Sequence, residues 1–219
     1  AVQYALVHNV ESSIYLDKFP VSWVEATSTL MEELAFDYVN DYTQYLSAFF
    51  GNPSGFSLFS HNVSSDCYAN SIAALFIYRK AGIGFIRDIF DMNYDTVSSI
   101  DSLLQTASLN TGILWPELLS RFYTESFFTG TRADSRYFIP DSRIIDQWNY
   151  RQGKCTAGVS VTKSILPYGM QAFSLLLPED MDSITLQVRC DLSGGSKSML
   201  PVSKLILIGM DSDTILEAP

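Results

Sequence analysis

The sequence predicts an α+β protein of more than one domain, with a mainly α-helical lobe followed by a small antiparallel β-sandwich-like unit. Apolar residues recur at helical spacing up to about residue 130, and after about residue 155 they alternate with polar residues as in strands. Helices followed by strands are the order that separate helical and β units produce. We therefore expect a helical lobe over residues 1–130, a connection rich in Arg, Asp and Tyr over 131–155, and a β unit over 156–219.

The helices of the lobe are delimited by recognisable start and stop signals. Ser22 begins a helix that runs to about residue 39 and buries one face, formed by Trp23, Ala26, Thr27, Leu30 and Leu34. Further helices are expected over residues 1–8, 41–50, 66–81, 85–90, 95–107 and 115–128. Gly82 and Gly84 are expected to separate two of them, and Pro116 suits the first turn of the last.

The second unit is expected to consist of strands. Its clearest alternation comprises Ile184, Leu186, Val188, Cys190 and Leu192, each followed by a polar residue or preceded by one. Further strands are expected over residues 159–165, 170–177 and 204–210, with a turn at residues 192–195.

The charge balance restricts the kinds of partner. The chain has 14 basic and 24 acidic residues, a net charge of −10, so nucleic acid and anionic membranes, which require clustered Lys and Arg, are not expected partners. No apolar run approaches the roughly 20 residues of a membrane-spanning helix, so no membrane insertion is expected. Cys67, Cys155 and Cys190 show no metal-binding spacing, and their disulfide pairing stays open.

Few residues are suited to catalysis by their type and spacing. His8 and His61 are the only histidines, and no Gly-x-Ser-x-Gly motif accompanies them. Glu32 and Glu33 are expected to form a solvated helix face. Glu25 has two interpretations: it forms a capping box with Ser22, or it is a metal ligand.

Several stretches resemble gluzincin-type zinc metallopeptidases. SWVEATSTLMEE resembles the second zinc helix of that family, whose W-x-E-A/G pattern carries a glutamate ligand, and AVQYA resembles the stretch just after the second histidine of the HExxH helix. CYANSIAALFIYRKAGIGFIRDIF, LLSRFYTESFFTGTR and SILPYGMQAFSLLL are similar to later parts of such proteins, so the similarity spans about residues 1–177. The resemblance implies that Glu25 is the third zinc ligand and that Tyr68 and His61 are candidate transition-state donors.

HExxH itself is not in this sequence, so two zinc ligands and the general base of that family are missing from it, and Glu25 is either a remnant or one part of a site completed elsewhere. The opening AVQYALVHNV has the spacing of a helix interior, so we expect a fragment from the C-terminal part of a secreted or cell-surface peptidase. The intact parent is then expected to hold zinc and to hydrolyse peptide or protein substrates, whereas this chain alone is expected to be inactive and free of zinc. The alternative is a non-enzymatic binding protein on a degenerate peptidase scaffold. A third possibility is a small-molecule binding protein with an apolar cleft between its lobes.

Overall fold

The protein is represented by a computed structural model, which divides into two compact units. One unit comprises residues 1–151 with 160–173, and the other comprises residues 152–159 with 174–219. The structure describes residues 21–58, 65–91, 104–105, 107–109, 112–148, 151–154, 170, 173–176, 205–208 and 215–218.

The first unit is helical. In chain order its elements are α3 (Val21–Ala35), η1 (Asp41–Tyr45), α4 (Ser47–Gly51), η2 (Ser65–Asn70), α5 (Ser71–Asp91), α7 (Trp115–Glu125), η3 (Gly130–Arg132) and η4 (Pro140–Arg143), where η denotes a 3-10 helix. The helices predicted from residues 22, 41, 66 and 115 are confirmed, although α3 and α7 end a few residues early. The predicted helix over residues 1–8 and the start of the one at 95 lie outside the described residues.

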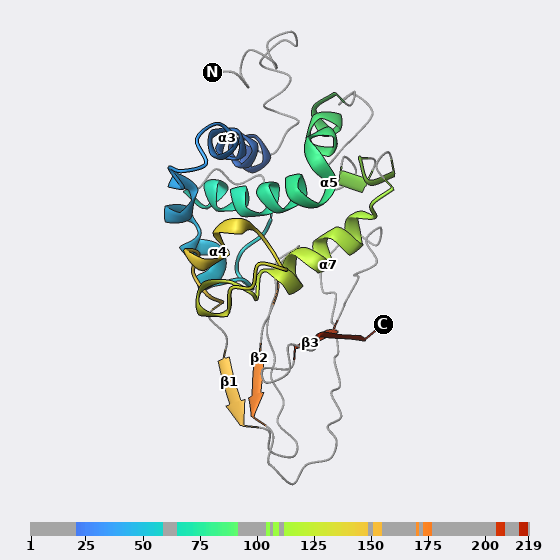
Figure 1. The fold of residues 1–219 in the computed structure, drawn as a ribbon. Helices are drawn as coiled ribbons and strands as arrows, with labels where there is room; N and C mark the ends of the chain where they lie inside the picture. Colours follow the sequence, from blue (N-terminus) through green and yellow to red (C-terminus); the bar gives the residue numbers. More distant parts are fainter. Residues whose placement is uncertain are drawn as a thin grey trace. The chain divides into compact units, whose positions relative to one another are not determined.

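The helices pack around an aromatic core. Helix α3 contacts η2 and α5, and α5 contacts α7, so that α5 lies between α3 and α7 (Figure 1). At the centre is Phe49, whose ring centroid is 4.9 Å from that of Phe50, 5.3 Å from that of Phe122 and 4.8 Å from that of Trp148. Such contacts are worth about 0.5–1.5 kcal/mol each beyond the apolar area they bury.

Much of the predicted connection belongs to this core. Within residues 131–155, Phe138, Ile139, Ile145 and Trp148 are buried, and Trp148 is only 3% exposed. The indole Nε1 of Trp148 donates a hydrogen bond of 3.1 Å to the Oγ of Ser126. The chain up to Trp148 is therefore held on the helical unit by apolar burial and a buried hydrogen bond.

Helix α5 is bent at Gly82, where the sequence predicts that one helix ends and another follows. Gly82 has φ 82° and ψ 171° and interrupts the helical backbone between Ser71 and Asp91. This conformation is accessible to glycine and strained for residues with a Cβ atom. The bend accounts for the change in direction of α5 in Figure 1.

Because of this conformation, Gly82→Ala is expected to destabilise the protein by about 1–3 kcal/mol. No atom lies within 4 Å of an added Cβ, so the expected loss comes from the backbone and not from a clash. Urea unfolding measures it. Gly84→Ala is the matched control, because Gly84 also has open space around an added Cβ but is not among the glycines with positive φ. Equal stability of the two variants would contradict a strained Gly82.

The predicted α+β class with a β-sandwich-like second unit is wrong. The described part of the chain is mainly helical, and its strands are short: β1 (Arg151–Lys154), β2 (Phe173–Leu176), β3 (Leu205–Ile208) and β4 (Ile215–Ala218). They form two separate two-stranded sheets, β1 with β2 and β3 with β4, the latter antiparallel with Leu205 opposite Ala218. A sandwich needs two larger sheets packed face to face. Alternation predicts β2 and β3 as strands but not how many partners a strand has, and the pattern over 184–192 lies outside the described residues.

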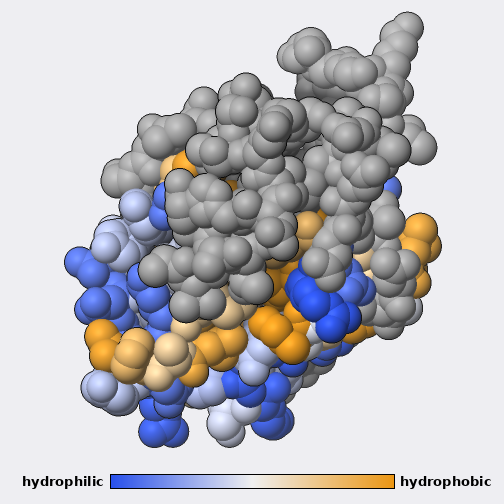
Figure 2. Space-filling view, turned by 90° about the horizontal axis from the view of Figure 1, so that it is seen from above, coloured by the Kyte–Doolittle hydropathy of each residue, from blue (hydrophilic) through white to orange (hydrophobic). Residues whose placement is uncertain are grey.

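The described surface carries apolar side chains near the end of α3. Phe36 is 55% exposed, and Leu34, which the sequence places on the buried face, is 40% exposed. Figure 2 shows orange, hydrophobic residues lying beside blue, hydrophilic ones on the face seen from above. Among the described residues, no helix combines the length and apolarity needed to span a bilayer.

Candidate functional site

Helix α3 positions two glutamates through its buried face. Trp23, Ala26 and Leu30 are buried at the spacing of one helical stripe, as predicted. The stripe continues to Glu33, which is only 7% exposed. The prediction that Glu33 belongs to a solvated face is therefore wrong, whereas Glu32 is exposed as expected.

Glu25 lies beside Tyr68, and both are candidate site residues from the sequence. Glu25 is half-buried on α3, and Tyr68 comes from η2, which packs against α3. The Tyr68 hydroxyl donates a hydrogen bond to the Glu25 carboxylate, and the negative charge of Glu25 is the main cause that raises the pKa of Tyr68, ahead of burial and this hydrogen bond. The Tyr68 ring is further held by Tyr45, with 5.0 Å between ring centroids.

This arrangement bears on both interpretations of Glu25. Helix α3 begins at Val21, so Ser22 and Glu25 both lie near its start, where a capping box forms. The carboxylate of Glu25 also accepts a hydrogen bond from a hydroxyl of another element. Metal-binding carboxylates are commonly oriented by such a second hydrogen bond.

The described residues around Glu25 do not form a complete zinc site. Zinc prefers histidine and cysteine with one carboxylate, and a catalytic site needs three protein ligands. In the part of the chain that the structure describes, Glu25 belongs to no group of three side chains able to hold a metal. His8 and His61 lie outside that part.

A second group of acids has no counterpart among the sequence predictions. Carboxylate oxygens of Glu33 on α3, Asp37 in the following turn and Asp141 on η4 all lie within 4.8 Å of one another. The Tyr42 hydroxyl donates a hydrogen bond of 3.0 Å to Oδ2 of Asp141. We name Glu33, Asp37 and Asp141 the acidic cluster. The sequence feature that points to the acidic cluster is the position of Glu33, three residues after Leu30 on the buried stripe of α3.

The acidic cluster has an unfavourable concentration of negative charge. Burial, then the charge of Asp141, then that of Asp37 raise the pKa of Glu33 from 4.5 to about 7. Burial and the charge of Asp141 also raise the pKa of Tyr42. Oε1 of Glu33 is buried and has no hydrogen-bond partner among the described residues. Such a group is costly unless a proton or a cation accompanies it.

A third acid, Glu125 at the end of α7, is fully satisfied by its neighbours. Its Oε2 lies 2.6 Å from the Lys80 Nζ and accepts a hydrogen bond of 2.9 Å from the Phe138 backbone N–H. Arg121 is 3.4 Å from Oε1. Phe138 has φ 59°, a left-handed conformation unusual for an aromatic residue, and Glu125 helps to hold it. These contacts join α5, α7 and the segment before η4.

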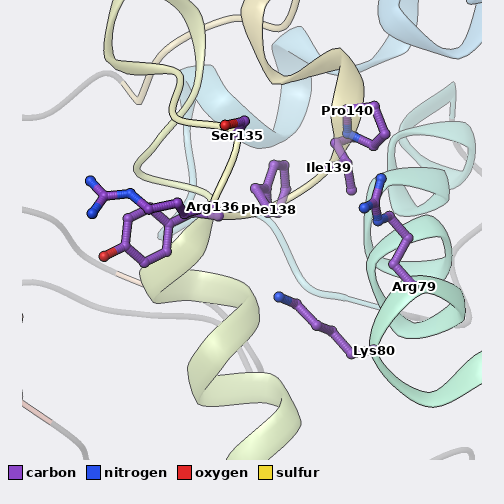
Figure 3. Close-up of a pocket in the computed structure, with 8 residues that line it drawn as sticks. Arg79, Lys80, Ser135, Arg136, Phe138, Ile139 and Pro140 are labelled. Atoms are coloured by element: carbon purple, nitrogen blue, oxygen red, sulfur yellow. The ribbon is translucent and has the colours of Figure 1, made fainter.

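A cavity of about 300 Å³ adjoins this ion pair, lined by Arg79 and Lys80 of α5 and by residues 135–140. Figure 3 shows Arg79 and Lys80 extending from the helix, with Phe138 and Ile139 on the loop across from them. Two of its three cationic side chains are already paired, Lys80 with the buried glutamate and Arg136 with Asp134 at 2.6 Å. The cavity therefore differs from the apolar cleft that a small-molecule binding protein would need.

Comparison with protein-family models, with curated proteins and with solved structures gives no match to this chain. The function of the chain is therefore inferred from its own residues.

Proposed function

We propose that the chain is the C-terminal part of a zinc metallopeptidase of gluzincin type, in which Glu25 is the third zinc ligand. The observation that carries this proposal is the hydrogen bond from Tyr68 to the Glu25 carboxylate. The sequence singles out Glu25 and Tyr68 separately, although more than forty positions lie between them. Their proximity in the fold supports a common role.

The residues of this chain have distinct parts in the proposed site. Trp23, Ala26 and Leu30 bury one face of α3 and so fix the direction of its helix. Glu25 presents one carboxylate, and Tyr68 orients it, which makes Tyr68 a positioning residue. Bound zinc in such enzymes supplies an activated water molecule for peptide-bond hydrolysis. The two histidine ligands and the general base belong to the HExxH segment that we place upstream.

The test compares this chain with one extended upstream through the proposed HExxH segment. Metal analysis should find one zinc per extended chain and no stoichiometric zinc in the shorter one, because one carboxylate is too few ligands. In the extended chain, Glu25→Gln should remove zinc and abolish hydrolysis of an unstructured peptide. Tyr68→Phe should retain zinc binding with lower affinity, since the hydrogen-bond partners of metal ligands contribute about 10–100-fold.

Glu32→Gln is the matched control, because it removes the same charge from an exposed position on the same helix. Full zinc occupancy and activity of the Glu25→Gln extended chain would reject the proposed ligand. Absence of an HExxH segment from the extended chain would favour the non-enzymatic binding protein.

A further inference from the structure

We propose that the acidic cluster of Glu33, Asp37 and Asp141 is a calcium site that joins the end of α3 to η4. The proposal does not depend on the zinc site: it concerns different residues and a different metal. Its ligands come from three places in the chain: a helix, the turn that follows it, and a short 3-10 helix far along the sequence.

The spacing of the oxygens suits one calcium ion. Calcium binds oxygen at about 2.3–2.6 Å, so two ligands of the same ion can be as far apart as about 5 Å. The three carboxylate oxygens lie within 4.8 Å of one another, inside that limit. Magnesium demands near-ideal octahedral geometry and keeps several of its waters, so a set of three protein carboxylates on one ion suits calcium better. An all-oxygen set also favours calcium over zinc, which prefers nitrogen and sulfur.

The buried oxygen of Glu33 provides a second and independent reason to place a cation at the acidic cluster. Glu33 is more than nine-tenths buried, its carboxylate faces those of Asp37 and Asp141, and its Oε1 has no hydrogen-bond partner among the described residues. A buried charge without a partner is strongly unfavourable, so a ligand for this oxygen is expected. Oδ1 of Asn40, in the turn between Asp37 and η1, is likewise buried and without a described partner.

The surroundings of the acidic cluster also suit a cation. Tyr42 is buried and donates its hydrogen bond to Oδ2 of Asp141, which fixes that carboxylate in place. The charges that act on Glu33 are those of Asp141 and Asp37, both negative. Asp37 is exposed, which gives an ion access from solvent and leaves room for coordinating water. Calcium normally completes its six to eight ligands with such water.

The test uses the purified chain after removal of metal with a chelator. Near neutral pH, calcium chloride at about a hundred times its Kd should raise the Tm by about 5–10 °C. Terbium, which replaces calcium, should show luminescence sensitised by nearby Tyr42 and be displaced by calcium. Glu33→Gln and Asp37→Asn should each remove the Tm rise and the terbium signal.

Glu32→Gln is again the matched control and should keep the full calcium response, because Glu32 is exposed beside Glu33 on the same helix. Glu33→Gln should fold, since it removes charge repulsion, and the exposed Asp37→Asn gives the same test if it does not. An unchanged Tm in millimolar calcium, or an equal rise in Glu33→Gln, Asp37→Asn and Glu32→Gln, would overturn the proposal. A Tm rise with magnesium as large as with calcium would also overturn the assignment to calcium.

Discussion

Glu125→Ala is expected to lower the free energy of unfolding of the helical unit by about 3–5 kcal/mol, because it leaves a buried ion pair without its anion. The Glu125 carboxylate has a side-chain exposure of 9% and lies 2.6 Å from Lys80 Nζ, whose own side chain is 20% exposed. Alanine also removes the acceptor for the N–H of Phe138, which is held at a positive φ. Urea unfolding followed by tryptophan fluorescence measures the loss.

Two further variants separate these contributions. Glu125→Gln keeps an acceptor for the Phe138 N–H but loses the charge. It should therefore lower the free energy of unfolding, but by less than Glu125→Ala does. Arg121→Ala removes only the more exposed partner, an i,i+4 pair at 3.4 Å, and should cost about 0.5 kcal/mol or less. If Glu125→Ala costs no more than Arg121→Ala, the ion pair with Lys80 does not stabilise the fold.

The helical part of the fold is accessible from sequence because its signals are local. Helical spacing locates α3, and its predicted stripe of Trp23, Ala26 and Leu30 is buried. Gly82 bends α5 because it lacks a side chain, which is a property of that residue alone. Local preferences of this kind do not depend on distant partners, and they therefore predict the helices correctly.

The predictions that are wrong depend on distant partners. Alternating apolar residues predict a strand but not the number of strands beside it, so the same pattern fits a two-stranded sheet and a sandwich. A distant contact also involves the connection expected over 131–155, where Trp148 packs on Phe49, nearly a hundred residues earlier in the chain. No local sequence pattern predicts the contact between Trp148 and Phe49.

The candidate site residues differ in the same way: some are indicated by local sequence, and others depend on distant contacts. Glu25 is singled out by the W-x-E-A pattern and Tyr68 by the family resemblance, and both stay predictions as site residues. The sequence places Glu33 in solvent because an acid beside another acid on a helix is usually exposed. Its burial follows from Asp141 and Tyr42, which the fold brings to α3 from other elements.

The buried Glu33 also predicts how stability varies with pH when calcium is absent. The pKa of Glu33 is about 7 in the folded chain, compared with 4.5 for a glutamate that is free in solvent, as in the unfolded chain. The folded state therefore binds the proton more tightly. Stability from this group is complete below about pH 4.5 and is lost as pH rises through 7. The expected loss is on the order of 1–2 kcal/mol, because each pKa unit corresponds to about 1.4 kcal/mol and solvent at the exposed Asp37 screens part of the repulsion.

Glu33→Gln isolates this effect from other titrating groups, because glutamine cannot ionise and is close in shape to the protonated acid. With a chelator present, the variant and the parent should be similar in stability near pH 4, and the variant should be more stable by on the order of 1–2 kcal/mol near pH 8. Urea unfolding at both pH values measures the difference, and Glu32→Gln should show none. A Glu33→Gln variant that is less stable than the parent at the higher pH would mean that the ionised carboxylate is already satisfied without metal. The acidic cluster would then need neither a proton nor calcium to be stable.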